Sequence, residues 1–378
     1  MLISLNFRYR ARFFCFNPFF FVELHPEKAA VMNEKITIND IALRTGLSKG
    51  TVDRVLHNRG EVSKKSYQKV MDVIRELDYE PNLYASLLAR SEQRTIALLL
   101  PDHRAGSYWA LASAGEQKAR PQLKPMSIVT KQFNYDQYSA ESFRAACTRV
   151  LESQPSGVVI APMFHYETTV FAKELLARSI PYVLVDNILD MPGHLAFYGI
   201  PAYKSGYLCA AMLTLGQPVK EALIVRILRD KERQSDPTVK RRAGFMDYML
   251  EHCPGCTIRT LFIDPEDPAA TDDALSAFFG EFPGVRHIAM LNSRLHLIAP
   301  YLERHPANRQ VVGFDNLEAN LAALKRGTVS ALIAQRPEEQ VRQAVQALAE
   351  RIVFQRMPEK TDNYMHMDIL IQYNAEDY

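Results

Sequence analysis

Carboxylate and amide side chains follow a series of short apolar runs in the part of the chain beyond residue 95. Each such group can hydrogen-bond two neighbouring hydroxyls, so a ring of them suits a ligand rich in hydroxyl groups. The alternative, that each residue caps the helix after it, explains a single residue equally well but the whole set less well. The residues are Asp102, Asp186, Asn187, Asp230, Asp264, Asn292, Ser293, Asp315 and Gln335.

The apolar runs indicate the elements that must position these side chains. Continuous β-branched or aliphatic runs bounded by turns are typical of buried parallel strands with helices between them. So many strand–helix units predict an α/β fold with two doubly wound parallel-sheet lobes, and a TIM barrel is the alternative. Ligands bind beyond the carboxyl ends of such strands, where the polar residues stand. The runs are Ile96–Leu100, Val158–Ala161, Tyr182–Val185, Leu223–Ile227, Thr260–Ile263, Ile288–Leu291, Val311–Phe314 and Leu332–Ala334.

A different pattern, between residues 37 and 77, predicts three short helices. Thr37, Ser48 and Ser63 are good N-caps, and Gly46 can end the first helix. Two short helices about a tight turn, closed by a third, make a helix-turn-helix, whose second helix presents its first residues to the DNA major groove. A generic three-helix bundle is the alternative that patterning alone leaves open.

The residues of this segment resemble the DNA-binding headpiece of the LacI/GalR family of transcription regulators. The family patterns D-I-A, G-(V/L)-S, T-V-x-R-V-L, V-S and Y-x-P-N-x-x-A are met at Asp40–Ala42, Gly46–Ser48, Thr51–Leu56, Val62–Ser63 and Tyr79–Ala85. The resemblance implies a small all-α headpiece over residues 33–81.

Carried over residue by residue, the resemblance places the base-reading positions at Lys49, Gly50 and Arg54. Arg54 can donate two hydrogen bonds to guanine. Gly50 has no side chain, so one of the usual readers is missing. Ser48 and Thr51 are implied to contact phosphates, which set the register on DNA rather than the sequence read.

Residues 82–93 correspond to the family's hinge helix and linker, a segment too short to be a stable helix alone. The resemblance makes Leu88 the leucine that wedges into the minor groove and kinks the duplex, and a solvent-facing linker residue is the alternative. On this hypothesis, Leu88→Ser keeps the fold but loses tight operator binding, which a gel shift would test.

From residue 94 to residue 378 the chain resembles the periplasmic-binding-protein-like effector domain of the same family. The resemblance implies that Tyr108 and Trp109 stack on a sugar ring, although core packing is the alternative for Trp109. Asn187 lies where some sugar-binding relatives place an arginine, which leaves the ligand open. Together with the strand-end residues, these contacts define the predicted ligand-binding site. Its residues are Asp102, Tyr108, Trp109, Asp186, Asn187, Arg241, Asn292, Asp315 and Gln335.

The same resemblance implies where the lobes begin and end. Lobe 1 is expected to span residues 94–198 and 337–363, and lobe 2 residues 199–336 and 364–378. The chain is expected to cross between the lobes at Gly199 and again at Arg336 and Pro337. The helix after Pro337 would return to lobe 1, and a last strand, Met367–Gln372, would return to lobe 2.

The composition excludes a disordered tail, a fibre and a small disulfide scaffold. The 378 residues are 47% hydrophobic and 23% charged, as in ordinary globular proteins. A net charge of +2 reveals no nucleic-acid partner, so phosphate contacts must come from a local patch. Five scattered cysteines favour reduced thiols and a cytoplasmic protein. The candidates for the basic patch are Lys49, Arg54, Arg59, Lys64 and Lys65.

The amino-terminal segment differs from the rest, because seven of the 19 phenylalanines fall before residue 22. Its apolar part is too short to span a bilayer, and no small-x-small cleavage site follows it. We interpret residues 1–32 as a non-native or disordered extension, with residues 1–31 upstream of the true start at Met32. A flexible arm and a weak membrane anchor are the alternatives.

Sequence motifs for nucleotide binding, zinc proteolysis and serine hydrolysis are missing. The C-x-x-C at Cys253–Cys256 lacks the second pair that a zinc site needs. We therefore predict no catalytic residue, no metal and no cofactor. The expected protein is a homodimeric repressor without a membrane partner, which reads a pseudo-palindromic double-stranded operator and closes on a small sugar or polyol. An activator or a non-sugar effector is the alternative; an α/β enzyme and a transport binding protein are less favoured.

Overall fold

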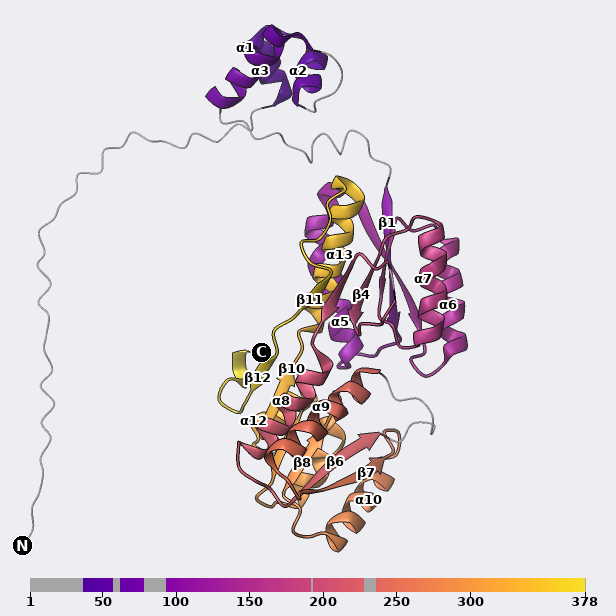
Figure 1. The fold of residues 1–378 in the computed structure, drawn as a ribbon, viewed down its shortest axis with the longest axis vertical. Helices are drawn as coiled ribbons and strands as arrows, with labels where there is room; N and C mark the ends of the chain where they lie inside the picture. Colours follow the sequence, from indigo (N-terminus) through magenta and orange to yellow (C-terminus); the bar gives the residue numbers. More distant parts are fainter. Residues whose placement is uncertain (1–36, 57–61, 78–92, 192, 228–235, 378) are drawn as a thin grey trace, which may run out of the picture. The chain divides into compact units, whose positions relative to one another are not determined.

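The computed structural model describes residues 37–56, 62–77, 93–191, 193–227 and 236–377. The chain divides into two compact units, residues 1–82 and 83–378 (Figure 1). Two sequence predictions, the wedge at Leu88 and the extension over residues 1–32, lie outside the described residues, as do Arg59 and Asp230.

The first unit contains the three predicted helices, α1 (Ile38–Thr45), α2 (Lys49–Leu56) and α3 (Lys64–Glu76). The backbone N–H of Thr37 donates to the Asp40 carboxylate over 2.7 Å at the start of α1. Gly46 ends α1 with φ of 65°, the left-handed conformation that glycine adopts without steric cost. The apolar faces meet in a small core of Ile41, Val52, Val55 and Val70.

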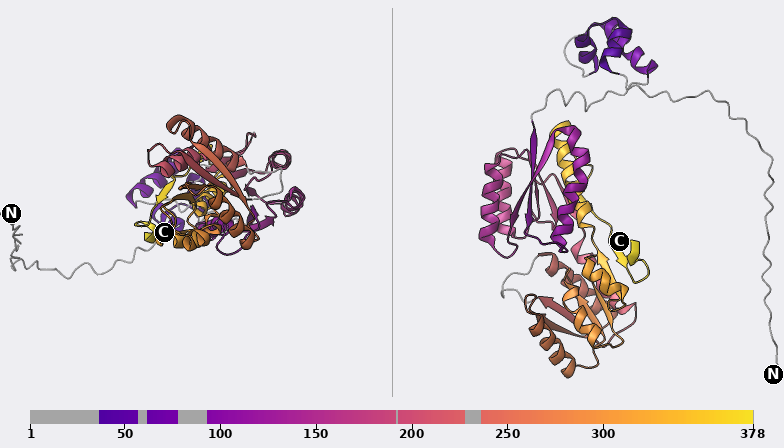
Figure 2. Two further views of the ribbon diagram at one scale, coloured as in Figure 1. Left: turned by 90° about the horizontal axis from the view of Figure 1, so that it is seen from below. Right: turned by 180° about the vertical axis from the view of Figure 1, so that it is seen from behind.

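The first lobe of the second unit is a six-stranded parallel sheet in the order β11-β5-β4-β3-β1-β2. Helices α6 and α7 cover one face, and α5 and α13 cover the other (Figures 1 and 2). The strands are β1 (Arg94–Pro101), β2 (Ile128–Tyr135), β3 (Gly157–Ile160), β4 (Tyr182–Asp186), β5 (Ala196–Gly199) and β11 (Asp362–Tyr364). The helices are α5 (Tyr108–Leu123), α6 (Ala140–Glu152), α7 (His165–Ala177) and α13 (Pro337–Phe354).

The second lobe repeats this arrangement with the order β12-β10-β9-β8-β6-β7, in which only β12 is antiparallel to its neighbour. The strands are β6 (Glu221–Ile227), β7 (Thr257–Ile263), β8 (His287–Met290), β9 (Gln310–Phe314), β10 (Ala331–Ala334) and β12 (Asp368–Leu370). The helices are α8 (Ala202–Thr214), α9 (Asp236–His252), α10 (Pro268–Glu281), α11 (Ala299–Arg304) and α12 (Glu318–Lys325).

The two sheets confirm the predicted pair of doubly wound lobes and exclude the TIM barrel, which has a single closed sheet. The chain passes between the sheets three times, after β5, after β10 and between β11 and β12. Each of the eight predicted runs overlaps a strand. The sequence pattern missed β2, which is a half-exposed edge strand, and the short strands β5 and β11.

Two glycines allow helices α8 and α9 of lobe 2 to approach closely. A Cβ on Gly206 in α8 would lie 1.8 Å from the backbone oxygen of Arg241 in α9, and one on Gly244 would lie 2.0 Å from the oxygen of Tyr203. Helices α8 and α9 therefore touch backbone to backbone. This contact fixes the position of Arg241.

None of the described helices is both long enough and apolar enough to cross a membrane. The four cysteines within the described residues are free thiols.

Candidate functional site

Two carboxylates stand at matching points of the two lobes. Asp186 is the last residue of β4, and Asp315 follows β9 directly; each is the fourth strand along its lobe. Both have a left-handed backbone, with φ of 66° and 68°. Aspartate tolerates this conformation better than most residues do, and such strain is found where function requires a fixed geometry. The backbone thus sets the direction of both carboxylates.

In lobe 2, Asp315 belongs to a buried hydrogen-bonded cluster. Arg241 Nη2 donates to Gln335 Oε1 over 2.6 Å, and Gln335 Nε2 donates to the two Asp315 oxygens over 2.9 and 3.0 Å. These three side chains are 6%, 2% and 1% exposed. The Arg241 guanidinium also lies over the Phe314 ring, 4.4 Å from its centroid. Three elements distant in sequence, α9, β9 and β10, therefore build this half of the site.

In lobe 1, Tyr108 at the start of α5 donates its hydroxyl to Asp186 Oδ1 over 2.5 Å. The Trp109 and Tyr108 rings are nearly perpendicular, with centroids 5.1 Å apart, and Trp109 belongs to the hydrophobic cluster that α5 shares with α13. Asn187 is 5% exposed and donates to the Pro162 oxygen over 3.2 Å. Tyr108 thus orients the carboxylate, while Trp109 and Asn187 have partners within lobe 1.

Burial dominates the electrostatics of both carboxylates. It raises the pKa of Asp315 from its ordinary value of 3.8 to about 7, against the opposing charge of Arg241. Burial also raises the pKa of Asp186, opposed by the Tyr108 hydrogen bond and by Arg241. Because the Arg241 charge acts on a carboxylate in each lobe, the two halves form one electrostatic unit.

Other predicted contacts do not join this cluster. Asn292 Oδ1 accepts from the backbone N–H of Arg294 over 2.9 Å, and Asp264 Oδ1 accepts from that of Glu266 over 2.9 Å. In these turns Asn292 and Asp264 stabilise their own loops, as in the alternative interpretation that strand-end polar residues serve local structure. Asp102 is exposed just after β1. The ligand contacts expected of Asn292, Asp264 and Asp102 stay predictions.

Two further contacts were not predicted. One joins the lobes: Arg294 in lobe 2 donates to the Tyr138 hydroxyl of lobe 1 over 2.9 Å. Arg336 and Asp368, which stand on two of the three crossover segments, form a two-bond ion pair of 2.5 and 2.8 Å. No sequence pattern marked these residues, because pairs so far apart in the chain leave no local signal.

In the headpiece, the predicted DNA-reading residues lie on the surface of α2. Lys49, Gly50 and Arg54 are exposed. The Ser48 hydroxyl accepts from the backbone N–H of Thr51 over 3.2 Å, and the two hydroxyl oxygens are 2.9 Å apart. Arg54 Nε donates to the Gly50 oxygen over 3.2 Å. An exposed guanidinium on the second helix is the geometry that base reading requires.

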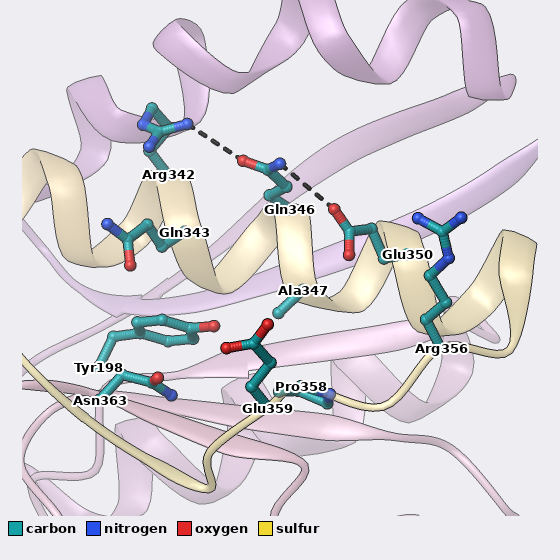
Figure 3. A pocket seen from close by; sticks show the side chains of 10 residues that line it. All are labelled: Tyr198, Arg342, Gln343, Gln346, Ala347, Glu350, Arg356, Pro358, Glu359 and Asn363. Carbon is teal, nitrogen blue, oxygen red and sulfur yellow. Dashed lines mark hydrogen bonds between the residues drawn. The ribbon is translucent and has the colours of Figure 1, made fainter.

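A cavity of about 330 Å³ lies on lobe 1, between α13 and the segment that leads into β11 (Figure 3). Arg342, Gln346 and Glu350 form a hydrogen-bonded ladder along its helical wall, with distances of 3.1 and 3.3 Å. None of the predicted ligand-binding residues lines this cavity.

Within the described residues, no group of three histidine, cysteine or acidic side chains could hold a metal ion. Cys253 is buried, and its Sγ contacts the Gln217 oxygen at 3.8 Å. Burial raises the pKa of the neighbouring Cys256 to about 11, which leaves it a thiol at neutral pH.

We expect Asp315→Asn to make the fold more stable at pH 8. Between pH 3.8 and about 7 the folded state holds a proton on Asp315 that the unfolded chain has lost, so the wild type loses stability as the pH rises through this window. Asparagine cannot ionise and tolerates a left-handed backbone. The gain should be about 1–3 kcal/mol at pH 8 and should shrink towards pH 5. Urea unfolding at both pH values measures it; an effect independent of pH would contradict it.

Comparison with known proteins finds relatives of both the three-helix headpiece and the two-lobed unit. A family model for bacterial regulatory proteins of the lacI family matches residues 37–82, and one for a periplasmic binding protein domain matches residues 96–355. The crystal structure of a putative LacI transcriptional regulator from Bacteroides fragilis is 35% identical, covers 76% of this chain and 100% of its own, and superposes with a TM-score of 0.72.

Curated relatives match over shorter stretches. The HTH-type transcriptional regulator DegA of Bacillus subtilis is 42% identical over 154 residues, which are 40% of this chain and 44% of DegA. The ribose operon repressor of Lactococcus lactis is 26% identical over 190 residues, 50% of this chain and 53% of the repressor. The chain thus spans about half the length of the curated relatives it matches. On its family models and its structural match, the chain belongs to the lacI family of bacterial regulatory proteins.

Proposed function

We propose that this chain is a sequence-specific DNA-binding transcription repressor whose operator affinity is controlled by a small sugar or polyol bound between its two lobes. The observation that carries the proposal is the single buried cluster formed by Tyr108 and Asp186 of lobe 1 with Arg241, Asp315 and Gln335 of lobe 2. A ligand that contacts both carboxylates must bridge the lobes.

The chemistry of the cluster favours an uncharged ligand with several hydroxyl groups. Two carboxylates share one arginine, so an added anion would meet uncompensated negative charge. Carboxylate and amide oxygens accept hydrogen bonds from neighbouring hydroxyls. A relative that is 26% identical over 190 residues is named as a ribose operon repressor, which supports both a sugar ligand and repression.

Control of DNA binding follows if the ligand prefers one arrangement of the lobes. A ligand shifts an equilibrium only by its difference in affinity for the two states. In a cytoplasmic homodimer, two headpieces would read the two halves of a pseudo-palindromic operator. A change in the lobes would alter how the two headpieces are presented, and therefore the affinity for DNA.

Arg54→Ala is expected to weaken binding to an operator that the protein itself selects from random DNA. A guanidinium with two hydrogen bonds to guanine contributes about 1–3 kcal/mol of discrimination, so affinity should fall roughly tenfold to a hundredfold, with less preference at one base pair. Arg75→Ala is the matched control, because Arg75 is also an exposed headpiece arginine and pairs with Asp72 on α3. Fluorescence anisotropy gives both affinities; an equal loss in the two variants would contradict base reading by Arg54.

The ligand is sought by thermal-shift screening with sugars, polyols and their phosphates. We expect uncharged compounds to raise the melting temperature and phosphorylated ones to leave it unchanged. Asp315→Asn should lose the response to the same compound while it keeps operator binding. A response that survives in this variant would remove Asp315 from the binding site.

A further inference from the structure

Gln340 bridges the two lobes from the first turns of α13. Its side chain is 1% exposed. Gln340 Oε1 accepts from the backbone N–H of Asp186 in lobe 1 over 3.1 Å, and Nε2 donates to the backbone oxygen of Gln335, which follows β10 of lobe 2, over 3.0 Å. Both ends of one buried amide are therefore hydrogen-bonded, each to the backbone of a different lobe.

The two backbone partners of Gln340 are themselves residues of the cluster. The Asp186 carboxylate accepts from Tyr108, and the Gln335 side chain joins Arg241 to Asp315. A continuous path of hydrogen bonds therefore leads from Tyr108 to Asp315. It passes through the side chain and backbone of Asp186, the Gln340 amide, and the backbone and side chain of Gln335. A single side chain outside the predicted site completes the path between its halves.

The local backbone holds Gln340 at this point. Arg336 has φ of 54°, a strained conformation for a residue with a side chain, and α13 begins at the next residue. The backbone N–H of Gln340 donates to the Arg336 oxygen over 3.2 Å. The Arg336–Asp368 ion pair ties this crossover to the one before β12. The bridging amide therefore lies about one helical turn beyond the crossover from lobe 2 to lobe 1.

We propose that Gln340 is a positioning residue that couples the two halves of the site, so that a displacement of Asp186 in lobe 1 is transmitted to Gln335 and Asp315 in lobe 2. A buried amide with both of its ends bonded resists separation of its partners, because a broken bond would leave a polar group unsatisfied. The inference goes beyond the proposed function: it concerns how the lobes are joined whether or not a ligand is bound.

The test is amide hydrogen exchange on the full-length protein carrying Gln340→Met, which keeps the length of the side chain but removes both hydrogen bonds. Exchange should accelerate about threefold to tenfold in two places, residues 182–187 of lobe 1 and residues 331–336 of lobe 2, relative to the remote strands β1 and β6. The Gln340 side chain accepts from the N–H of Asp186 but only donates to lobe 2, at the Gln335 oxygen. If Gln340 merely protected the N–H that it binds, exchange in residues 331–336 would not change.

Gln343→Met is the matched control, because Gln343 is a half-buried glutamine of the same helix whose hydrogen bond, donated to Glu339 over 2.5 Å, stays within α13. It should change neither region. Acceleration confined to residues 182–187, acceleration in neither region, or an equal change in the control would overturn the proposal.

If Gln340→Met does not fold, Gln340→Glu at pH 8 replaces it. This variant retains an oxygen to accept from Asp186 but has no N–H for Gln335, so only residues 331–336 should exchange faster. Unchanged exchange there would overturn the proposal. The experiment uses neither DNA nor effector, so its failure leaves the proposed function standing, and failure of the ligand screen leaves this inference standing.

Discussion

Arg241→Met should lower the free energy of unfolding by about 3–5 kcal/mol, the usual cost when one partner of a buried ionic cluster is removed. Arg241 is 6% exposed, and its charge lowers the pKa of both Asp186 and Asp315. Methionine fills much of the same volume, so the loss would come mainly from the carboxylates left without their cation. Urea unfolding at pH 8 measures the change.

Arg242→Met is the matched control for this experiment. Arg242 is the next residue of α9 but is exposed, so its replacement should change stability by about 0.5 kcal/mol or less. Adding Asp315→Asn to Arg241→Met should recover part of the loss, because it removes one uncompensated carboxylate. An equal effect of the two arginine replacements, or no recovery in the double variant, would contradict the electrostatic explanation.

Gly206→Ala should cost about 3 kcal/mol and abolish the effector response. The added Cβ would lie 1.8 Å from the backbone oxygen of Arg241, a contact that only a shift of α8 away from α9 can relieve. Because that oxygen belongs to Arg241 itself, the shift also moves the guanidinium away from Gln335. Thermal unfolding and the ligand-induced shift report the two consequences.

Gly280→Ala, in the same lobe, is expected to stabilise the protein, whereas Gly206→Ala should destabilise it. Gly280 is an exposed residue of α10, and a Cβ there would meet nothing within 4 Å. Alanine should stabilise this helix by about 0.5–1 kcal/mol, since it restricts the unfolded chain. If Gly206→Ala proved as harmless as Gly280→Ala, the close contact between α8 and α9 would not control the site.

The headpiece was largely predictable because its signals are local. N-caps such as Ser63 and the left-handed Gly46 act within one turn of the helix they bound, so a short stretch of sequence contains both the signal and its effect. The buried central strands were predictable for a similar reason, since each is a continuous apolar run. Strand β2 has a polar face towards solvent, so apolar runs could not reveal it.

The sequence by itself predicted the fold class and placed Asp186, Asp315 and Gln335 at strand ends, because a strand end followed by a polar side chain is a local pattern. Tyr108 and Arg241 do not stand at strand ends and were predicted only through the family resemblance. The sequence could not decide which of these residues meet. Asp186 and Asp315 join one cluster, whereas Asn292 and Asp264 bond to the backbone two residues on. Only the tertiary structure made that choice. Arg241 and Gln335 are 94 residues apart, and Gln340, inside a helix with no local mark, lies between the lobes solely because the chain crosses back there.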